Sequence, residues 1–317
     1  MASKAAVPTI DLSKFVAGDT ASQQAFVAEL GNAFHEVGFV GVVNHGISAD
    51  LIARFYAAAK RFFAHDTDFK RRYEVNDLAG QRGYTSFGKE HAKHTNVGDL
   101  KEFFQIGQTP DNDEDRKIYP KNVVVTEEAE FSALGDELYK AFEACGAHLL
   151  RAVAIHLNLG EDFFTAKIHN GNSILRAIHY PPITHEPKSA IRAEQHEDIN
   201  LITLLVGASA GGLELLTMED EWVPVDAAEG ELVINVGDML QRLTNNYLKS
   251  TTHRVVNPPR EEWHLPRLSI PFFLHPRQEM DLTCLPSCVT PSNPLAYEPI
   301  TAGDYLDERL REIGLKK

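Results

Sequence analysis

The second half of the chain is a succession of short apolar segments, and this pattern constrains the fold more than any other feature. Turn-forming residues separate the segments, several of which are rich in β-branched or alternating side chains. From about residue 172 they read SILRAIHY, INLITLLV, GLELL, WVPV, ELVINVG, HRVVN and RLSIPFFL. Many short strands at such spacing are typical of a sandwich or barrel. We therefore predict a mainly β core.

The first half of the chain predicts helices instead. Residues 19–38 carry apolar side chains at steps of three and four, and Thr20 with Gln23 matches a capping box. A second helix is predicted to begin at Ser48. The longest follows one apolar stripe over residues 131–157, a pattern that indicates packing against a core.

These patterns divide the chain into four regions around the β core. Residues 1–125 form an N-terminal region of helices and strands that packs on the core, and residues 126–171 hold the long supporting helix. Residues 172–280 form the β core itself, and residues 281–317 a C-terminal loop and helix. The predicted architecture is mainly β with flanking helices.

The charge balance limits the classes of partner. Among 317 residues, 31 Lys and Arg stand against 45 Asp and Glu, a formal net charge of −14 that argues against nucleic acid and anionic membranes. The N-terminus lacks the apolar stretch of a signal peptide, and no apolar run approaches the ~18 residues of a membrane span. We expect a cytoplasmic protein that binds a small molecule, with a monomer as the default state.

The segment AEQHEDINLITLL, residues 193–205, places His196 and Asp198 in what reads as a buried strand. Ionisable side chains are costly to bury without partners. Alternate residues of a strand face the same side, so the two would project together and could chelate one ion. Taken alone, such a pair is more often a solvent-facing strand end.

His253, in LKSTTHRVVN, changes that balance. It follows 55 residues after Asp198, which leaves room for several strands and a return beside the first pair. Alone it would be read as an ordinary surface or core histidine. With His196 and Asp198 it completes two histidines and one carboxylate, the set that non-haem Fe(II) oxygenases use while leaving coordination positions open.

A candidate carboxylate site follows in RLSIPFFL. Arg267 and Ser269 are two residues apart, so a guanidinium fork and a hydroxyl share one face of the strand. Fourteen residues separate Arg267 from His253, enough for one hairpin, which would place the arginine on the neighbouring strand. Tyr180, before two prolines, could point its hydroxyl at the same ligand. The alternatives are a surface arginine and a core tyrosine.

Several blocks of the chain together resemble a known family. VPTIDLSKF, AFHEVGFVGVVNHGI, HEDINLITLLV, GGLELL with WVPV, GELVINVGDMLQRLTNN, KSTTHRVVNP and RLSIPFFLHP occur in that family's order, from about residue 7 to 276. The chain is similar to the Fe(II)- and 2-oxoglutarate-dependent oxygenases related to isopenicillin N synthase. The resemblance implies a double-stranded β-helix, or jelly roll, with an N-terminal helical region packed on it.

The resemblance also implies an activity and its residues. His196, Asp198 and His253 would bind Fe(II), and the distal carboxylate of the co-substrate 2-oxoglutarate would be held by Arg267, Ser269 and Tyr180. With O2, the enzyme would hydroxylate, desaturate or cyclise a small molecule, with succinate and CO2 as co-products. Two alternatives stay open. Some members keep Arg-x-Ser yet do not consume 2-oxoglutarate, and a non-catalytic jelly-roll binding protein would share the fold.

Residues 80–107 resemble the segment that lines the substrate entrance in bacterial relatives. Arg82, Tyr84 and Phe104 are the candidate substrate contacts in it. Ordinary loop structure and packing would explain each of these residues equally well.

Overall fold

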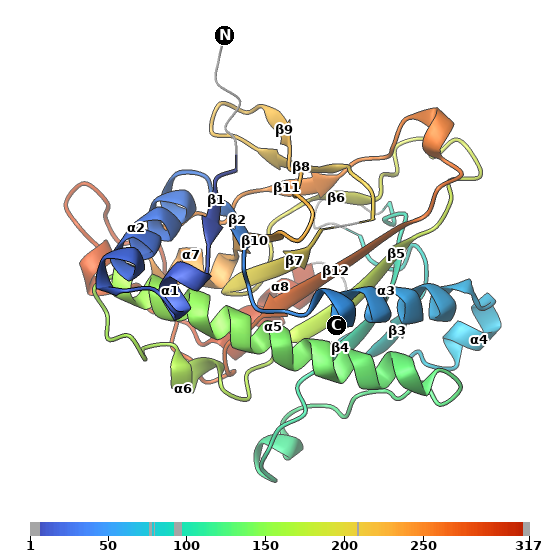
Figure 1. The fold of residues 1–317 in the computed structure, drawn as a ribbon, viewed down its shortest axis with the longest axis horizontal. Helices are drawn as coiled ribbons and strands as arrows, with labels where there is room; N and C mark the ends of the chain where they lie inside the picture. Colours follow the sequence, from blue (N-terminus) through green and yellow to red (C-terminus); the bar gives the residue numbers. More distant parts are fainter. Residues whose placement is uncertain (1–6, 76–77, 79, 92–96, 208, 313–317) are drawn as a thin grey trace.

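Two facing β-sheets with helices on the outside of the larger one make up the molecule (Figure 1). The computed structural model describes residues 7–75, 78, 80–91, 97–207 and 209–312. This arrangement is the predicted jelly roll, and each apolar run predicted as a strand contains one.

The larger sheet draws its strands from both halves of the chain. Its order is β1 (Thr9–Asp11), β2 (Phe39–Val43), β10 (Leu232–Val236), β7 (Ile202–Val206), β12 (Arg267–Leu274), β5 (Ile174–Tyr180), β4 (Glu102–Gly107) and β3 (Gly83–Thr85). The smaller sheet runs β6 (Ala193–His196), β11 (His253–Val255), β8 (Leu213–Leu216) and β9 (Trp222–Pro224). Only the β1–β2 pair of the described strands is parallel. The N-terminal region therefore supplies both edges of the larger sheet.

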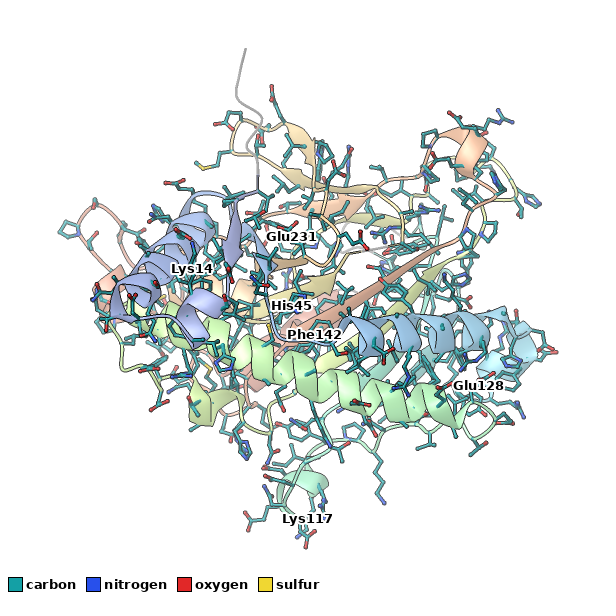
Figure 2. All side chains as sticks on the ribbon, in the orientation of Figure 1. Lys14, His45, Lys117, Glu128, Phe142 and Glu231 are labelled. Atoms are coloured by element: carbon teal, nitrogen blue, oxygen red, sulfur yellow. The ribbon has the colours of Figure 1, made fainter. Side chains whose placement is uncertain are left out.

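The outer face of the larger sheet is covered by helices. The helices of the described residues are α1 (Ser13–Val16), α2 (Thr20–Glu36), α3 (Ala49–Ala64), α4 (Thr67–Arg71), α5 (Ala129–His156), α6 (Thr165–Ile168), α7 (Asp238–Leu243) and α8 (Ala302–Glu312). Single 3-10 turns are η2 (Asp115–Lys117), η3 (Arg260–Glu262) and η4 (Pro286–Cys288). The long α5 contacts β4, β5, β7 and β12, with α2 and α3 beside it (Figure 1). Phe142 shows the packing: it projects from α5 and stacks on Phe272 of β12 at 5.4 Å between ring centroids (Figure 2).

The helix starts are set by side-chain caps. Ser48 caps α3 as predicted, and its hydroxyl accepts from the amide of Leu51. For α2 the predicted cap was wrong by one residue: Asp19 accepts from the amide of Ser22, while Thr20 is already helical. The extended backbone of Asp19 lets its carboxylate face the free N–H groups of the first turn.

Strand alternation divides the buried side chains into two layers. Along β5, Leu175 and Ala177 join the cluster under the helices, whereas Ile178 and Tyr180 join a second cluster between the sheets. The same alternation on β12 sends Leu268, Ile270, Phe272 and Leu274 toward the helices. The intervening residues of these strands, including the polar ones, are therefore free to face the space between the two sheets.

The segment over residues 193–205 is not one strand. β6 ends at His196 and β7 begins at Ile202, and between them the chain passes from the smaller sheet to the larger. Asp198 lies in this connection. The backbone amide of Asp238 donates to the carbonyl oxygen of Asp198, and that of Gly237 donates to the carbonyl oxygen of Leu201. These bonds hold the connection against the start of α7 and take the place of pairing with a strand. The reasoning from strand alternation for His196 and Asp198 was therefore wrong.

No helix of the described residues is long and apolar enough to cross a membrane.

Candidate active site

His196, Asp198 and His253 meet in one cluster despite their separation in sequence. His253 lies directly opposite His196 in the β6–β11 pair, and the two imidazole rings are 4.5 Å apart between centroids. The Nε2 atom of each histidine lies 3.9 Å from Oδ1 of Asp198. One donor atom from each residue falls within 4.8 Å of the others, a geometry that could hold one metal ion.

Backbone carbonyls orient both imidazoles. Nδ1 of His196 lies 2.7 Å from the carbonyl oxygen of Glu194, and Nδ1 of His253 lies 3.1 Å from that of Thr251. A carbonyl can only accept, so each Nδ1 carries the proton and each Nε2 keeps its lone pair toward Asp198. This tautomer leaves Nε2 free to ligate a metal.

Asp198 is oriented in the same way. Its Oδ2 accepts from the hydroxyl of Thr203 at 2.6 Å and from the side-chain amide of Asn235 at 2.8 Å. Both donors come from strands of the larger sheet, β7 and β10. Because they occupy Oδ2, Oδ1 is left to face the two histidines.

Burial and mutual proximity set the protonation states of the cluster. Burial is the main reason that the pKa of His196 is lowered to about 4, and the charge of a protonated His253 is the second. Burial would raise the pKa of Asp198, but His253, His196 and its hydrogen bonds outweigh it and lower that pKa. The site therefore offers the Nε2 atoms of two imidazoles and one carboxylate oxygen. That donor set suits Fe(II) with open positions.

The candidate carboxylate site lies on the opposite sheet from the histidines. Arg267 is on β12 of the larger sheet, so it is not on the strand neighbouring His253, as the sequence predicted. The reason is that the chain between β11 and β12 crosses from one sheet to the other. Arg267 is 1% exposed, pairs in register with Tyr180, and lies 4.9 Å from that ring's centroid. Ser269 lies two residues further along β12, on the same face of the strand, and is also buried.

A cavity of about 530 Å³ opens beside the histidine–aspartate cluster. His196 and Asp198 line it. Its apolar lining consists of Ile174, Ile199, Leu216, Phe273, Leu306 and Leu310. Two of these side chains, Leu306 and Leu310, come from α8, whose sequence carries no signal of a place at the site. A hydrogen bond from Tyr305 and an ion pair from Arg309, both to Asp238, hold this helix in place.

Charged side chains form a buried network in the cavity wall. Lys101 lies 2.8 Å from both Glu90 and Asp99, and Arg176 lies 3.2 Å from Glu90. Burial opposes charge on both partners, but the ion pairs outweigh it, so the pKa of Glu90 falls to about 2 and that of Lys101 rises. Glu90 and Lys101 are therefore both charged at neutral pH.

The structure does not bring the three predicted substrate contacts to this cavity. Tyr84 and Phe104 face the helices, where their rings lie 6.1 and 5.2 Å from Phe62. Arg82 is fully buried against Gly107. Strand alternation is the reason: on β4 the neighbour of Phe104, Gln105, is the residue that lines the cavity. Other residues of the segment, Gln81, Glu90 and Lys101 among them, do line the cavity. Which face of β4 each residue occupies was not readable from the sequence.

Comparisons with known proteins agree with this geometry. A family model described as the N-terminal region of non-haem dioxygenases in morphine synthesis matches residues 7–127, and the 2OG-Fe(II) oxygenase superfamily model matches residues 171–276. The 2-oxoglutarate-dependent dioxygenase htyE of Aspergillus rugulosus is 30% identical over 95% of each chain. The proline hydroxylase buaE of Petromyces alliaceus is 31% identical over 96% of this chain and 98% of its own.

Solved structures give the same result. A 2OG-Fe(II) oxygenase family protein from Caulobacter crescentus is 41% identical, with a TM-score of 0.87 over 97% of this chain and 99% of its own. A full-length Neurospora crassa protein, solved in complex with alpha-KG, is 28% identical, with a TM-score of 0.86 over 96% of each chain. Neither the oxidase that omits 2-oxoglutarate nor the non-catalytic binding protein is favoured by these relatives. The chain is an Fe(II)- and 2-oxoglutarate-dependent dioxygenase and belongs to the 2OG-Fe(II) oxygenase superfamily.

Proposed function

We propose that His196, Asp198 and His253 bind the Fe(II) and that the cavity beside them receives a small-molecule substrate. The observation that carries this assignment is the pair of Nε2 atoms facing Oδ1 of Asp198, each 3.9 Å away and oriented by other hydrogen bonds. Bound iron, with 2-oxoglutarate and O2, supplies the oxidising chemistry, and succinate and CO2 are the co-products. The protein's own contribution is to position these groups and to keep water from the cavity.

Arg267, Ser269 and Tyr180 are the proposed contacts for the distal carboxylate of 2-oxoglutarate. Among the described residues, no carboxylate lies within ion-pair distance of Arg267, and its Nη1 has no hydrogen-bond partner. A buried guanidinium without an anion is costly, and a dicarboxylate ligand would supply one. The alternative of a surface arginine does not fit a side chain that is 1% exposed.

Replacing Arg267 with alanine is expected to weaken 2-oxoglutarate binding far more than iron binding. The loss of a buried charge-assisted pair costs about 2–5 kcal/mol, a weakening of about 30-fold or more. The measurement is an anaerobic titration of the apo-protein with Fe(II) and then 2-oxoglutarate, followed by the visible charge-transfer band. Arg260→Ala, an exposed arginine, is the control and should titrate like the wild type. If the wild type binds iron but develops no band, the co-substrate assignment is wrong.

The cavity wall also indicates the charge of the substrate. Among the described residues that line it, Lys101, Arg176 and Arg309 are the side chains with a permanent positive charge, and each already pairs with a carboxylate. No cation is therefore left for a substrate carboxylate or phosphate. We infer a neutral or cationic substrate with an apolar part. The structural relative from Neurospora crassa has also been solved with thymine, an uncharged molecule.

A matched pair of compounds tests this inference. For any compound that stimulates succinate formation, we expect an ester or amide to be turned over with a lower KM than the corresponding free carboxylic acid. The reason is that the acid would have to enter beside Glu90 and Asp99 without a free cation. The measurement is substrate-stimulated succinate release at fixed 2-oxoglutarate. A lower KM for the free acid would contradict the inference.

The proposal places this activity in the cytoplasm, in a monomer without nucleic acid or membrane partners. The net charge of −14 supports the absence of polyanionic partners. Light scattering of the purified chain is the measurement for the monomer, and cell fractionation for the compartment.

A further inference from the structure

A second buried arginine lies beside the proposed co-substrate site. Arg192 immediately precedes β6 and is 2% exposed. Its guanidinium lies 5.9 Å from the ring centroid of Tyr180, and that of Arg267 lies 4.9 Å from the same centroid. Two buried guanidinium groups therefore lie near one tyrosine ring, one from just before β6 of the smaller sheet and one from β12 of the larger sheet.

Neither guanidinium is fully satisfied. Arg192 donates from Nη2 to the carbonyl oxygen of Leu265 at 3.1 Å, and Arg267 donates from Nε to that of Ala210 at 3.0 Å. Nε of Arg192 and Nη1 of Arg267 are buried without a partner. Both recorded acceptors are neutral carbonyls, and no ion pair to either arginine occurs among the described residues. Neither positive charge thus has an ion-pair partner within the part of the chain that the structure describes, although the charge of Glu262 acts on Arg192 from beyond ion-pair distance.

Two like charges without ion-pair partners are unstable in a buried site. Burial is the main cause that lowers the pKa of Arg192, and the positive charge of Arg267 is the second. The third cation nearby, Lys101, is already compensated by Glu90 and Asp99. An anion with two acceptor oxygens would satisfy the free donors of both arginines and remove their repulsion. The chemistry that fits is a carboxylate group.

We propose that Arg192 is a second guanidinium of the co-substrate site and holds the distal carboxylate of 2-oxoglutarate together with Arg267. This inference rests on the proposed assignment of Arg267 to that carboxylate. Arg192 immediately precedes β6, which ends at His196, so the proposed anion contact and the proposed metal ligand lie at the two ends of one short stretch. Two guanidinium groups from separate segments of the chain would constrain the carboxylate more than a single arginine can.

The test compares two keto acids in the variant Arg192→Met, which keeps an unbranched apolar side chain. The loss of one charged hydrogen bond is expected to weaken 2-oxoglutarate binding by about 10- to 100-fold in the anaerobic titration. Binding of 2-oxobutyrate, which lacks the distal carboxylate, should stay within about twofold of its wild-type value because the lost contact never touches it. The preference for 2-oxoglutarate therefore falls, while Fe(II) affinity is unchanged.

Controls separate this role from a purely structural one. Arg260→Met removes an exposed arginine and should change neither keto acid's affinity. Arg192→Lys keeps the charge and should recover part of the lost 2-oxoglutarate affinity, which also covers the case in which Arg192→Met does not fold. Equal weakening of both keto acids, or no weakening of 2-oxoglutarate in either variant, overturns the inference. Failure of the wild type to bind 2-oxoglutarate would instead overturn the proposed function.

Discussion

Replacing His196 with alanine is expected to abolish 2-oxoglutarate-dependent oxidation. The variant keeps Asp198 and His253 but loses one of three donor atoms, so Fe(II) is no longer held with a defined set of open positions. We expect the rate of succinate formation at saturating substrate to fall by about 1,000-fold or more, since the metal carries the chemistry. The same sample should also bind Fe(II) more weakly in the anaerobic titration.

His185→Ala is the matched control, because His185 is an exposed histidine outside the cluster. Its activity and iron affinity should equal those of the wild type. Circular dichroism should show that both variants are folded, since His196 is at the end of a short strand and makes no large core contact. Activity of His196→Ala within tenfold of the wild type would mean that this histidine is not a metal ligand.

Replacing Phe62 with alanine is expected to cause a large loss of stability. Phe62 of α3 is fully buried, and its ring lies within 5.2 Å of those of Phe63, Phe104 and Phe131. Truncation leaves a cavity where this helix meets α5 and β4. Such Phe-to-Ala changes lower the free energy of unfolding by about 3–5 kcal/mol. The measurement is the urea midpoint of unfolding, with the slope of the transition unchanged.

Phe87→Ala removes the same side chain from a site where it is 50% exposed. This control should change the free energy of unfolding by less than about 0.5 kcal/mol, as is usual for surface positions. A loss for Phe62→Ala no larger than that of the control would show that the aromatic cluster under α3 is dispensable for stability.

The strand and helix pattern was readable because burial imposes a period on the sequence. The stripe along α5 and the short runs from β5 to β12 each record which faces are buried, and the structure confirmed these elements. Helix caps were readable to within one residue, as Asp19 and Ser48 show. The sequence did not show which residues of β4 face the helices and which face the cavity. The reason is that both faces of that strand are buried, as is every one of its residues.

The sequence by itself determined the chemical groups of the site: two histidines, an aspartate and an arginine near a serine, in an order that resembles one family. Only the tertiary structure decided where they lie. Asp198 reaches the histidines from a connection between sheets and not from a strand, and Arg267 lies on the opposite sheet from them. Neither α8, which lines the cavity, nor Arg192, which lies beside Tyr180, carried a local signal of that position. The physical reason is that local periodicity records burial, whereas convergence depends on how two sheets face each other, and contacts between sheets leave no period in the chain.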